Sequence, residues 1–321
     1  ILAELSEKHQ IVSLNNIEFA YDENLPRYVS TPSHMAYLKI GEGCDNKCTY
    51  CIIPKIRGKF RSRLEKNILD EVNLLVNNGV KEIILIAQDL TDYGVDIYGK
   101  RMLHDLVRKI SLIDGVEWIR LLYCYPEEIT DELIEEIANN DKVVKYLDLP
   151  IQHISSKVLK QMGRRTNKET IIDKIETLRN KVPNIALRTS LIVGFPGETE
   201  EEFNELATFL KDYKLENVGV FAYSQEEDTP AAIMDGQIEE NIKKERQNTL
   251  MAIQRDVVKE QIKLKIGNIY DTIIDSNNGE YFIGRNYEMA PEIDGLIYIK
   301  KHDGLSIGDI IKVKVTDVME Y

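Results

Sequence analysis

The sequence predicts an α/β fold, namely an open, partial (βα)6 barrel of the TIM-barrel type followed by a small antiparallel β-barrel. From residue 36 onward, short apolar segments alternate with longer amphipathic segments, as expected for parallel strands joined by helices. Beyond residue 267, short apolar runs are separated by turns rich in Gly and Asn, which indicates an antiparallel sheet. Six strand–helix units are fewer than the eight of a closed barrel, so we expect an open one.

The expected strands and helices of the barrel alternate along the chain. The strands are expected at Tyr37–Ile40, Glu82–Ala87, Trp118–Tyr123, Tyr146–Pro150, Ile185–Val193 and Val218–Tyr223. The helices are expected at Glu65–Asn77, Met102–Ile110, Asp131–Ala138, Lys168–Lys181 and Glu200–Tyr213. Right-handed crossovers place these helices outside the curved sheet, and such sheets bind ligands at the carboxyl ends of their strands.

Three regions follow from this pattern. Residues 1–35 are expected to form a linker, residues 36–253 the partial barrel, and residues 254–321 the small β-barrel with its lead-in helix. That helix belongs to a long polar, amphipathic stretch at Glu239–Lys265. The strands of the second domain are expected at Tyr270–Ile274, Tyr281–Gly284, Leu296–Lys300 and Ile310–Val315.

Composition narrows the class of protein. The chain has 321 residues, of which 43% are hydrophobic, so a large core is possible. Its formal net charge of −13 disfavours a broad electrostatic grip on nucleic acid. No apolar run reaches the length of a membrane span, and no secretory signal opens the chain, which begins with Ile1 rather than Met and is expected to be a fragment. The few cysteines favour a reducing compartment, the cytoplasm.

Three of the four cysteines form a cluster directly after the first expected strand. Cys44, Cys48 and Cys51 have the spacing Cys-x-x-x-Cys-x-x-Cys. Thiolates are soft ligands for iron–sulfur clusters or zinc, but structural zinc normally takes four protein ligands, and His34 is ten residues upstream. Three thiolates on a four-iron cluster leave one iron open to another ligand. Structural zinc and free thiols remain the alternatives, and the isolated Cys124 is expected to be a small buried residue.

The cysteine spacing, with Tyr50 before the last cysteine, resembles the signature of the radical S-adenosylmethionine (SAM) superfamily. The resemblance implies that Cys44, Cys48 and Cys51 ligate a 4Fe–4S cluster and that SAM binds its open iron. It also implies that reduction cleaves SAM to a 5′-deoxyadenosyl radical, which abstracts hydrogen from the substrate. Tyr50 is expected to shape the adenine pocket. An enclosed, water-poor site suits such a radical.

Polar residues and glycines at other strand ends are candidates for cofactor contact. Gln152 and the Gly194 backbone are expected to contact SAM, and Asp89 to contact SAM or substrate. Arg188, inside an apolar strand, could hold the SAM carboxylate. The alternatives are a solvated loop for Asp89, an ordinary loop contact for Gln152 and a salt bridge at the barrel end for Arg188.

A basic stretch after the cysteines allows two interpretations. Arg57, Arg61 and Arg63, with Lys55 and Lys59, could neutralise the cluster or bind a phosphate, or could face solvent. The acidic run Glu226–Asp228 could attract a basic partner, and solvation is the alternative.

Longer strings resemble the methylthiotransferase family, whose members insert sulfur into a C–H bond and methylate it. The resemblance covers nearly all of residues 36–321 and includes LPIQHIS, LRTSLIVGFPGETEEEF, YSQEEDTPAA and the RG-x-x-x-SR pattern. AQD-x-T-x-YG, QHIS, SQEE and APEIDG are similar to the RimO branch, which methylthiolates a β-carbon of an aspartate in small-subunit ribosomal protein number twelve. The branch of MiaB type, which modifies tRNA, usually carries QSGS instead of QHIS.

The resemblance also implies cofactors and partners. The terminal module resembles a TRAM domain, and residues 266–321 contain five Lys and Arg against ten Asp and Glu, a net charge of −5. That sign suits a basic ribosomal protein better than RNA, so we expect no tight nucleic-acid binding. An electron donor such as a flavodoxin-type protein is implied. Because the family carries an amino-terminal domain with a second cluster, this chain is expected to be the radical SAM and TRAM portion. A tRNA methylthiotransferase and a non-catalytic, metal-containing ribosomal-protein-binding module remain the alternatives.

Overall fold

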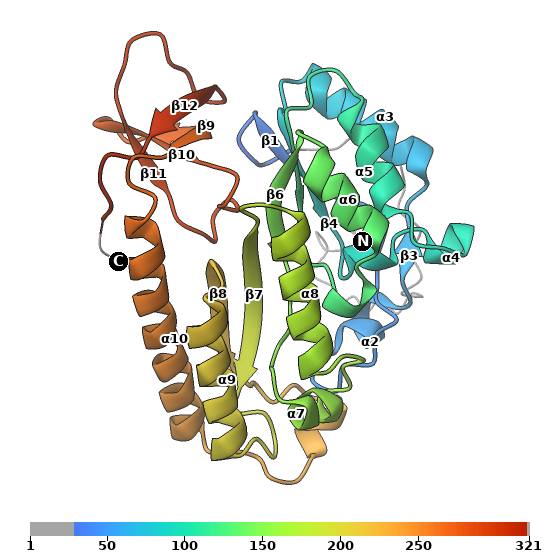
Figure 1. The fold of residues 1–321 in the computed structure, drawn as a ribbon. Helices are drawn as coiled ribbons and strands as arrows, with labels where there is room; N and C mark the ends of the chain where they lie inside the picture. The colour runs from blue at the N-terminus through green and yellow to red at the C-terminus, as the bar shows by residue number, and fades with distance from the viewer. Residues whose placement is uncertain (1–28, 320–321) are drawn as a thin grey trace, which may run out of the picture.

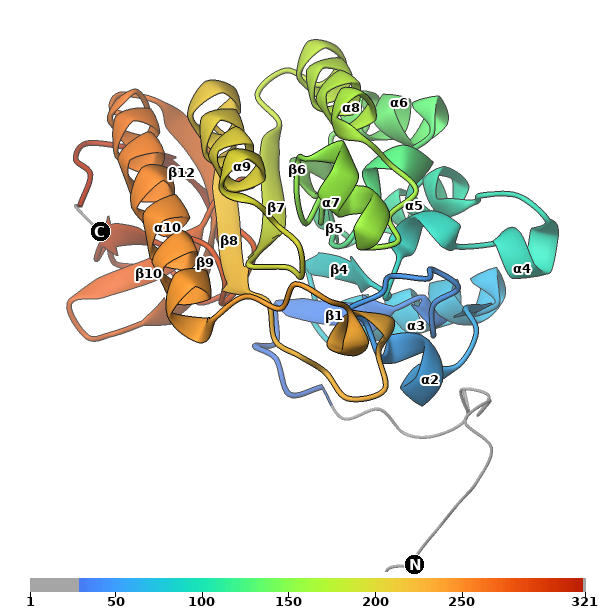
Figure 2. The ribbon, with the colours of Figure 1, turned by 90° about the horizontal axis from the view of Figure 1, so that it is seen from below.

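The computed structural model describes residues 29–319, so most of the expected linker at residues 1–35 lies outside the described part. The larger domain contains a parallel six-stranded sheet in the order β1-β4-β5-β6-β7-β8. The sheet curves, and its helices lie on the outside of the arc (Figures 1 and 2). The expected partial (βα)6 barrel is confirmed. Its strands are β1 (Met35–Lys39), β4 (Glu82–Ile86), β5 (Trp118–Leu121), β6 (Val143–Asp148), β7 (Ala186–Val193) and β8 (Asn217–Ala222).

The long helices match their expected positions within a few residues. They are α3 (Glu65–Asn77), α5 (Leu103–Ser111), α6 (Asp131–Asn139), α8 (Lys168–Lys181), α9 (Glu200–Tyr213) and α10 (Glu240–Lys263). Their apolar faces pack against the strands in one buried core. The helix α9 begins with the expected capping box, in which the Thr199 and Glu202 side chains each bond the other residue's backbone N–H.

Several short elements were not expected from the sequence. They are β2 (Gly41–Glu42), α2 (Ile53–Arg57), β3 (Arg61–Ser62), α4 (Val95–Tyr98), α7 (Ser156–Gln161) and the 3-10 turns η1 (Leu90–Asp92), η2 (Pro126–Glu128) and η3 (Pro230–Ile233). The strand β6 also begins at Val143, before the expected Tyr146. Lys145 interrupts its apolar pattern, but the ammonium group reaches the carbonyl oxygens of Ala138 and Asn140 at the end of α6, so its stem can lie along the sheet.

The smaller domain is a four-stranded antiparallel sheet in the order β11-β10-β9-β12. Its strands are β9 (Ile269–Asn277), β10 (Tyr281–Arg285), β11 (Ile297–Lys300) and β12 (Ile310–Lys314), close to the expected positions. The expected boundary after residue 253 lies inside α10, which packs against α9, β7 and β8 as one continuous helix. None of the helices within residues 29–319 has an apolar stretch suited to crossing a bilayer.

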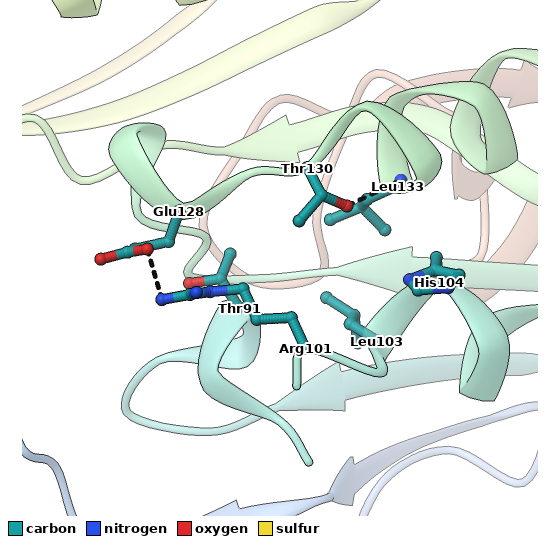
Figure 3. A pocket seen from close by; sticks show the side chains of 7 residues that line it. All are labelled: Thr91, Arg101, Leu103, His104, Glu128, Thr130 and Leu133. Atoms are coloured by element: carbon teal, nitrogen blue, oxygen red, sulfur yellow. Dashed lines mark hydrogen bonds and ion pairs between the residues drawn. The ribbon is translucent and has the colours of Figure 1, made fainter. Parts of the chain in front are cut away.

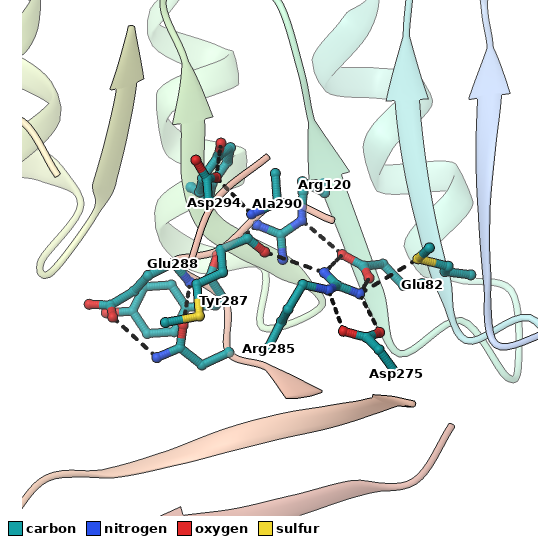
Figure 4. Close-up of polar contacts among 12 residues, drawn as sticks. Glu82, Arg120, Asp275, Arg285, Tyr287, Glu288, Ala290 and Asp294 are labelled. Carbon is teal, nitrogen blue, oxygen red and sulfur yellow. Dashed lines mark hydrogen bonds and ion pairs between the residues drawn. The ribbon is translucent and has the colours of Figure 1, made fainter. Parts of the chain in front are cut away.

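The smaller domain contacts the amino-terminal ends of the barrel strands. Glu82, the first residue of β4, accepts hydrogen bonds from Arg120 Nε and Arg285 Nη2, both at 2.8 Å (Figure 4). Arg285 also bonds Asp275 through Nε at 2.6 Å, and Asp275 lies 2.8 Å from His34 Nε2. Glu82 and Arg120 are fully buried, so this network ties the two domains together and leaves the carboxyl ends of the strands as the open end.

Candidate functional site

The three clustered cysteines lie on one loop at the carboxyl end of β1, between β2 and α2. The loop folds back closely on itself, because a Cβ at Gly43 would lie 2.1 Å from the Lys59 carbonyl oxygen, and Gly43 has a φ of +81°. The Cys44 N–H donates to the Gly58 carbonyl at 3.1 Å. Cys44 and Cys48 are each 8% exposed, while Cys51 is half-buried. The three thiols therefore lie on one short, closely packed turn.

The chemistry of these thiols suits a soft metal. Burial raises the pKa of Cys44 to about 11 and also raises the pKa of Cys51. Both thiols therefore keep their protons at neutral pH until a soft metal displaces them. Within residues 29–319, no three His, Cys, Asp or Glu side chains converge as a single metal ion requires. Three thiols on one short loop are the ligand set of a four-iron cluster with one iron open, because thiolates are the soft ligands that such clusters take.

Asp89 supports the cysteine loop from the end of β4. It is fully buried, its side chain accepts a hydrogen bond from the Thr91 N–H at 3.0 Å, and it accepts one from Asn46 Nδ2 at 3.1 Å. Asn46 lies between the first two cysteines and also accepts from Arg165 Nη2 at 2.8 Å. Burial raises the pKa of Asp89 to about 7. Asp89 is therefore buried beside the cysteine loop, unlike the solvated loop that was the alternative, and its contact with SAM or substrate stays a prediction.

Tyr50 is part of an aromatic wall. Its ring meets Phe195 edge to face at 6.5 Å, and Phe195 meets Tyr223 in the same way at 5.4 Å. Burial raises the pKa of Tyr50 well above its usual value. These rings come from the cysteine loop, the loop after β7 and the end of β8, so three strand ends share one apolar surface. Tyr50 as part of an adenine pocket remains a prediction.

Gln152 lies at the carboxyl edge of the sheet. It follows β6, has a φ of +69°, and pairs through its backbone with the Ser190 carbonyl at 2.9 Å and the Ile192 N–H at 2.8 Å. Gln152 is 6% exposed. A non-glycine residue with positive φ is uncommon and often marks a functional position. A contact between its amide and SAM stays a prediction.

The Gly194 backbone N–H already has a hydrogen-bond partner within the chain. Its N–H donates to Glu198 Oε2 at 2.7 Å, and a Cβ at this position would lie 2.3 Å from Lys243 Cγ. Glu198 also pairs with Arg246 Nη1 at 2.8 Å. Gly194 therefore allows α10 to approach the loop after β7, and its N–H does not face the cysteines as a free donor. Contact of its backbone with SAM stays a prediction.

Arg188 lies toward the other end of the barrel. Its Nη1 donates to Asp294 Oδ1 at 2.7 Å, and its Nε is 3.9 Å from Asp148 Oδ1. Asp294 belongs to the smaller domain, between β10 and β11. The structure thus contains the salt bridge that the sequence left as the alternative. The expectation that Arg188 holds the SAM carboxylate finds no support in its contacts.

The basic stretch does not face the cysteines as a group. Arg57 lies 3.8 Å from Glu42, and Arg61 donates to the Lys59 carbonyl at 2.7 Å. Arg63 is buried and pairs with Glu71 at 2.7 Å. These contacts favour a structural role for the stretch.

Three residues near the cysteine loop were not predicted from the sequence. Tyr125 Oη lies 3.8 Å from Cys48 Sγ, and the buried Arg164 guanidinium lies over the Tyr125 ring at 4.0 Å. Tyr123, at the end of β5, has a φ of +75° and is 39% exposed. The Tyr-Cys-Tyr string after the third strand was visible in the sequence. The sequence gives no sign, however, that Arg164 is buried while the neighbouring Arg165 is exposed.

A small pocket elsewhere does not add a ligand site. It lies between η1, α5 and α6, and its lining includes Thr91, His104 and the ion pair of Arg101 with Glu128 (Figure 3). Its volume of about 10 Å³ has room for a single water at most. The cysteine loop and its surroundings are therefore the stronger candidate site.

Comparisons with known proteins agree with this site. The sequence model of the radical SAM superfamily matches residues 38–210, and that of the TRAM domain matches residues 266–321. The chain is 62% identical over 295 residues to the ribosomal protein uS12 methylthiotransferase RimO of Clostridium botulinum strain Langeland, covering 92% of this chain and 66% of the relative. It is 58% identical over 312 residues to the RimO of Clostridium perfringens strain 13, covering 97% and 70%. The chain therefore spans about two thirds of the length of these curated relatives.

Solved structures show the same fold at low identity. The radical SAM methyltransferase TsrM from Kitasatospora setae, with cobalamin and a [4Fe-4S] cluster bound, is 18% identical with a TM-score of 0.52, covering 62% of this chain and 38% of that one. Coproporphyrinogen III oxidase HemN from Escherichia coli is 16% identical with a TM-score of 0.50, covering 73% and 54%. These likenesses concern the fold alone.

Proposed function

The chain belongs to the radical SAM superfamily and, within it, to the RimO family of methylthiotransferases, and on this premise we propose that it is the radical SAM and TRAM portion of a methylthiotransferase. The proposed reaction adds a methylthio group to the β-carbon of an aspartate of small-subunit ribosomal protein uS12. The observation that carries the proposal is the three-cysteine loop at the open end of the barrel, in a chain with 62% identity to a RimO relative.

The cofactors in this proposal are one 4Fe–4S cluster and SAM. Cys44, Cys48 and Cys51 would hold the cluster, and the only other cysteine, Cys124, is fully buried. When bound, the reduced cluster supplies the electron that cleaves the sulfonium bond of SAM and so gives the radical that takes hydrogen from the substrate carbon. A low-potential donor, such as a flavodoxin-type protein, would deliver that electron.

The residues of this chain position and enclose the reactants. Tyr50 and Phe195 offer an apolar, aromatic surface next to the cysteines, which suits an adenine ring and keeps water out. The hydrogen bond from Asn46 to Asp89 fixes the loop between the first two cysteines. The ion network at the opposite end of the barrel holds the smaller domain in place, so the reactants would enter at the carboxyl ends of the strands.

The acidic smaller domain supports a protein substrate. Residues 266–321 carry a net charge of −5, which repels nucleic acid and attracts a basic ribosomal protein. We expect binding to purified uS12 that weakens with salt, and no gel shift with tRNA. Tight, salt-sensitive binding of tRNA would instead favour the tRNA-modifying branch of the family.

Anaerobic reconstitution tests the cofactor assignment. The chain should bind about four irons. Reduction with SAM should then release 5′-deoxyadenosine. Cys48→Ala should lose both, whereas Cys124→Ala removes a more deeply buried thiol and should keep both. Zinc in place of iron, or reconstituted protein that makes no 5′-deoxyadenosine, would show that the chain is a metal-containing binding module.

A further inference from the structure

Arg164 is a buried cation with few partners. The residue is 6% exposed, and its guanidinium makes one hydrogen bond, from Nη2 to the Pro150 carbonyl at 3.0 Å. Its Nε and Nη1 atoms have no hydrogen-bond partner among the described residues. Glu127 Oε2 lies 3.8 Å from Nη2, which is an ion pair but too long for a hydrogen bond, and it leaves Nε and Nη1 without a partner. Buried N–H groups without an acceptor are destabilising, so the arrangement suggests an anionic partner in addition to Glu127.

The backbone places Arg164 beside the cysteine loop. Thr49 donates its N–H to the Met162 carbonyl and its hydroxyl to the Gln161 carbonyl, both at 2.9 Å. Gly163, which follows Met162, has a φ of +71°, and a Cβ at Gly163 would lie 2.5 Å from the Lys47 carbonyl oxygen. The end of α7 therefore packs directly on the turn that contains Cys48. This close contact fixes the position of Arg164.

Tyr125 links the Arg164 side chain to the same cysteine. The guanidinium lies 4.0 Å from the centre of the Tyr125 ring, and the hydroxyl of that ring is 3.8 Å from Cys48 Sγ. Other cations near the loop are paired or exposed to solvent. Arg165 bonds Asn46 at 2.8 Å and Glu128 at 3.0 Å, and Arg57 and Arg61 lie on the exposed basic stretch.

A four-iron cluster on three thiolates is the anion that fits this position. An oxidised core of charge 2+ with three thiolates has a net charge of −1, and gain of one electron makes it −2. A fixed positive charge in a low-dielectric site favours the more negative form. We propose that Arg164 is the buried counter-charge of the cluster and raises its reduction potential, so that the electron donor can reduce it. This inference rests on the cluster assignment in the proposed function.

An anaerobic redox titration without SAM tests the proposal. The reconstituted chain is compared with Arg164→Gln, Arg164→Lys and the control Lys160→Gln, which removes an exposed charge at the end of the same helix. The electron paramagnetic resonance signal of the reduced cluster is followed against applied potential. At a fixed potential, the ratio of reduced to oxidised cluster should fall about tenfold in Arg164→Gln, a shift of about −59 mV for one electron. Arg164→Lys should keep most of the wild-type value, and Lys160→Gln all of it.

A second variant covers the case in which Arg164→Gln does not bind iron. In Arg164→His, the imidazole carries a charge at pH 6 and none at pH 9. The midpoint potential should fall between these pH values by more than it does in the wild-type chain.

The outcomes are distinguishable from failure of the proposed function. A wild-type chain without iron would refute the cluster itself. An Arg164→Gln variant with wild-type iron content and wild-type midpoint potential would refute the role of Arg164 alone. An unchanged midpoint with weakened SAM binding would also overturn it, because the guanidinium would then serve the SAM carboxylate.

Discussion

Replacing Glu82 with Gln should destabilise the chain strongly. The carboxylate is fully buried and accepts hydrogen bonds from Arg120 and Arg285, both at 2.8 Å. Glutamine keeps the volume but removes the charge, so Arg285 would keep Asp275 as its anion and Arg120 would keep only the Tyr287 carbonyl as a hydrogen-bond partner. Removing one partner from a buried ion pair costs about 3–5 kcal/mol in the free energy of unfolding.

The single tryptophan makes the assay specific to this interface. Trp118 begins β5 and packs with Ile273 and Ala290 of the smaller domain. Its fluorescence during urea unfolding therefore reports on the contact that Glu82→Gln weakens. The control is Lys312→Gln, which breaks an ion pair with Asp271 at 3.0 Å whose side chains are 75% and 57% exposed. That change should cost less than about 1 kcal/mol.

The pH dependence of the free energy of unfolding tests the electrostatic argument. Burial alone would raise the pKa of Glu82, but the charges of Arg120 and Arg285 outweigh it, and the pKa is lowered. The stability that this carboxylate contributes is therefore present above its unfolded pKa of about 4.3 and is lost as the pH falls through the lower folded pKa. Wild type and Glu82→Gln should differ most near neutral pH and converge in acid. A loss below about 1 kcal/mol at pH 7, or a difference that stays constant down to pH 3, would refute the electrostatic argument.

Three further predictions concern other positions. Burial raises the pKa of Asp148 to about 7, so the free energy of unfolding of the wild type should fall as the pH rises from about 4 to 7. In urea titrations, Asp148→Asn should reduce this fall by up to about 4 kcal/mol, and parallel pH curves for the two proteins would contradict the prediction. The added Cβ of Gly194→Ala would lie 2.3 Å from Lys243 Cγ, whereas that of the control Gly279→Ala, also at positive φ, has no atom within 4 Å. The free energy of unfolding should therefore fall by about 1–3 kcal/mol more in Gly194→Ala, and equal losses in the two variants would refute the clash. Because Tyr123 has a φ of +75°, Tyr123→Gly should be more stable to urea than Tyr123→Ala by about 1 kcal/mol, and the reverse order would show that its backbone is not strained.

The sequence predicted the repeating architecture well because local patterns encode it. The strands of the barrel are short apolar runs, and the intervening helices carry apolar residues at helical spacing, so both could be placed before any contact was known. The cysteine loop was equally visible, since its ligand spacing lies within eight residues. Short elements such as β3 and α4 were missed because their few residues carry no periodic pattern.

Contacts between distant segments were not predictable in the same way. Glu82 and Arg285 are 203 residues apart, and neither residue shows in its neighbourhood that it is buried with the other. Arg164 and Arg165 are adjacent and chemically identical in the sequence, yet packing on Tyr125 buries only the first. Arg188 shows the converse, because its position in an apolar strand predicted a partner correctly without indicating which one.

The charged groups at the two ends of the barrel have different partners, and this difference bears on the assignment of the site. At the amino-terminal end, the charges of Glu82, Arg285 and Asp275 are matched across the interface between the domains. At the carboxyl end, Tyr123 and Gln152 follow successive strands with positive φ, and Arg164 keeps unpaired N–H groups. Strained backbone and unsatisfied polar groups cost free energy that packing elsewhere must offset, and they persist where function requires them. Arg164, which packs on Tyr125 beside Cys48, is the unsatisfied cation that a site for an anionic cofactor would need.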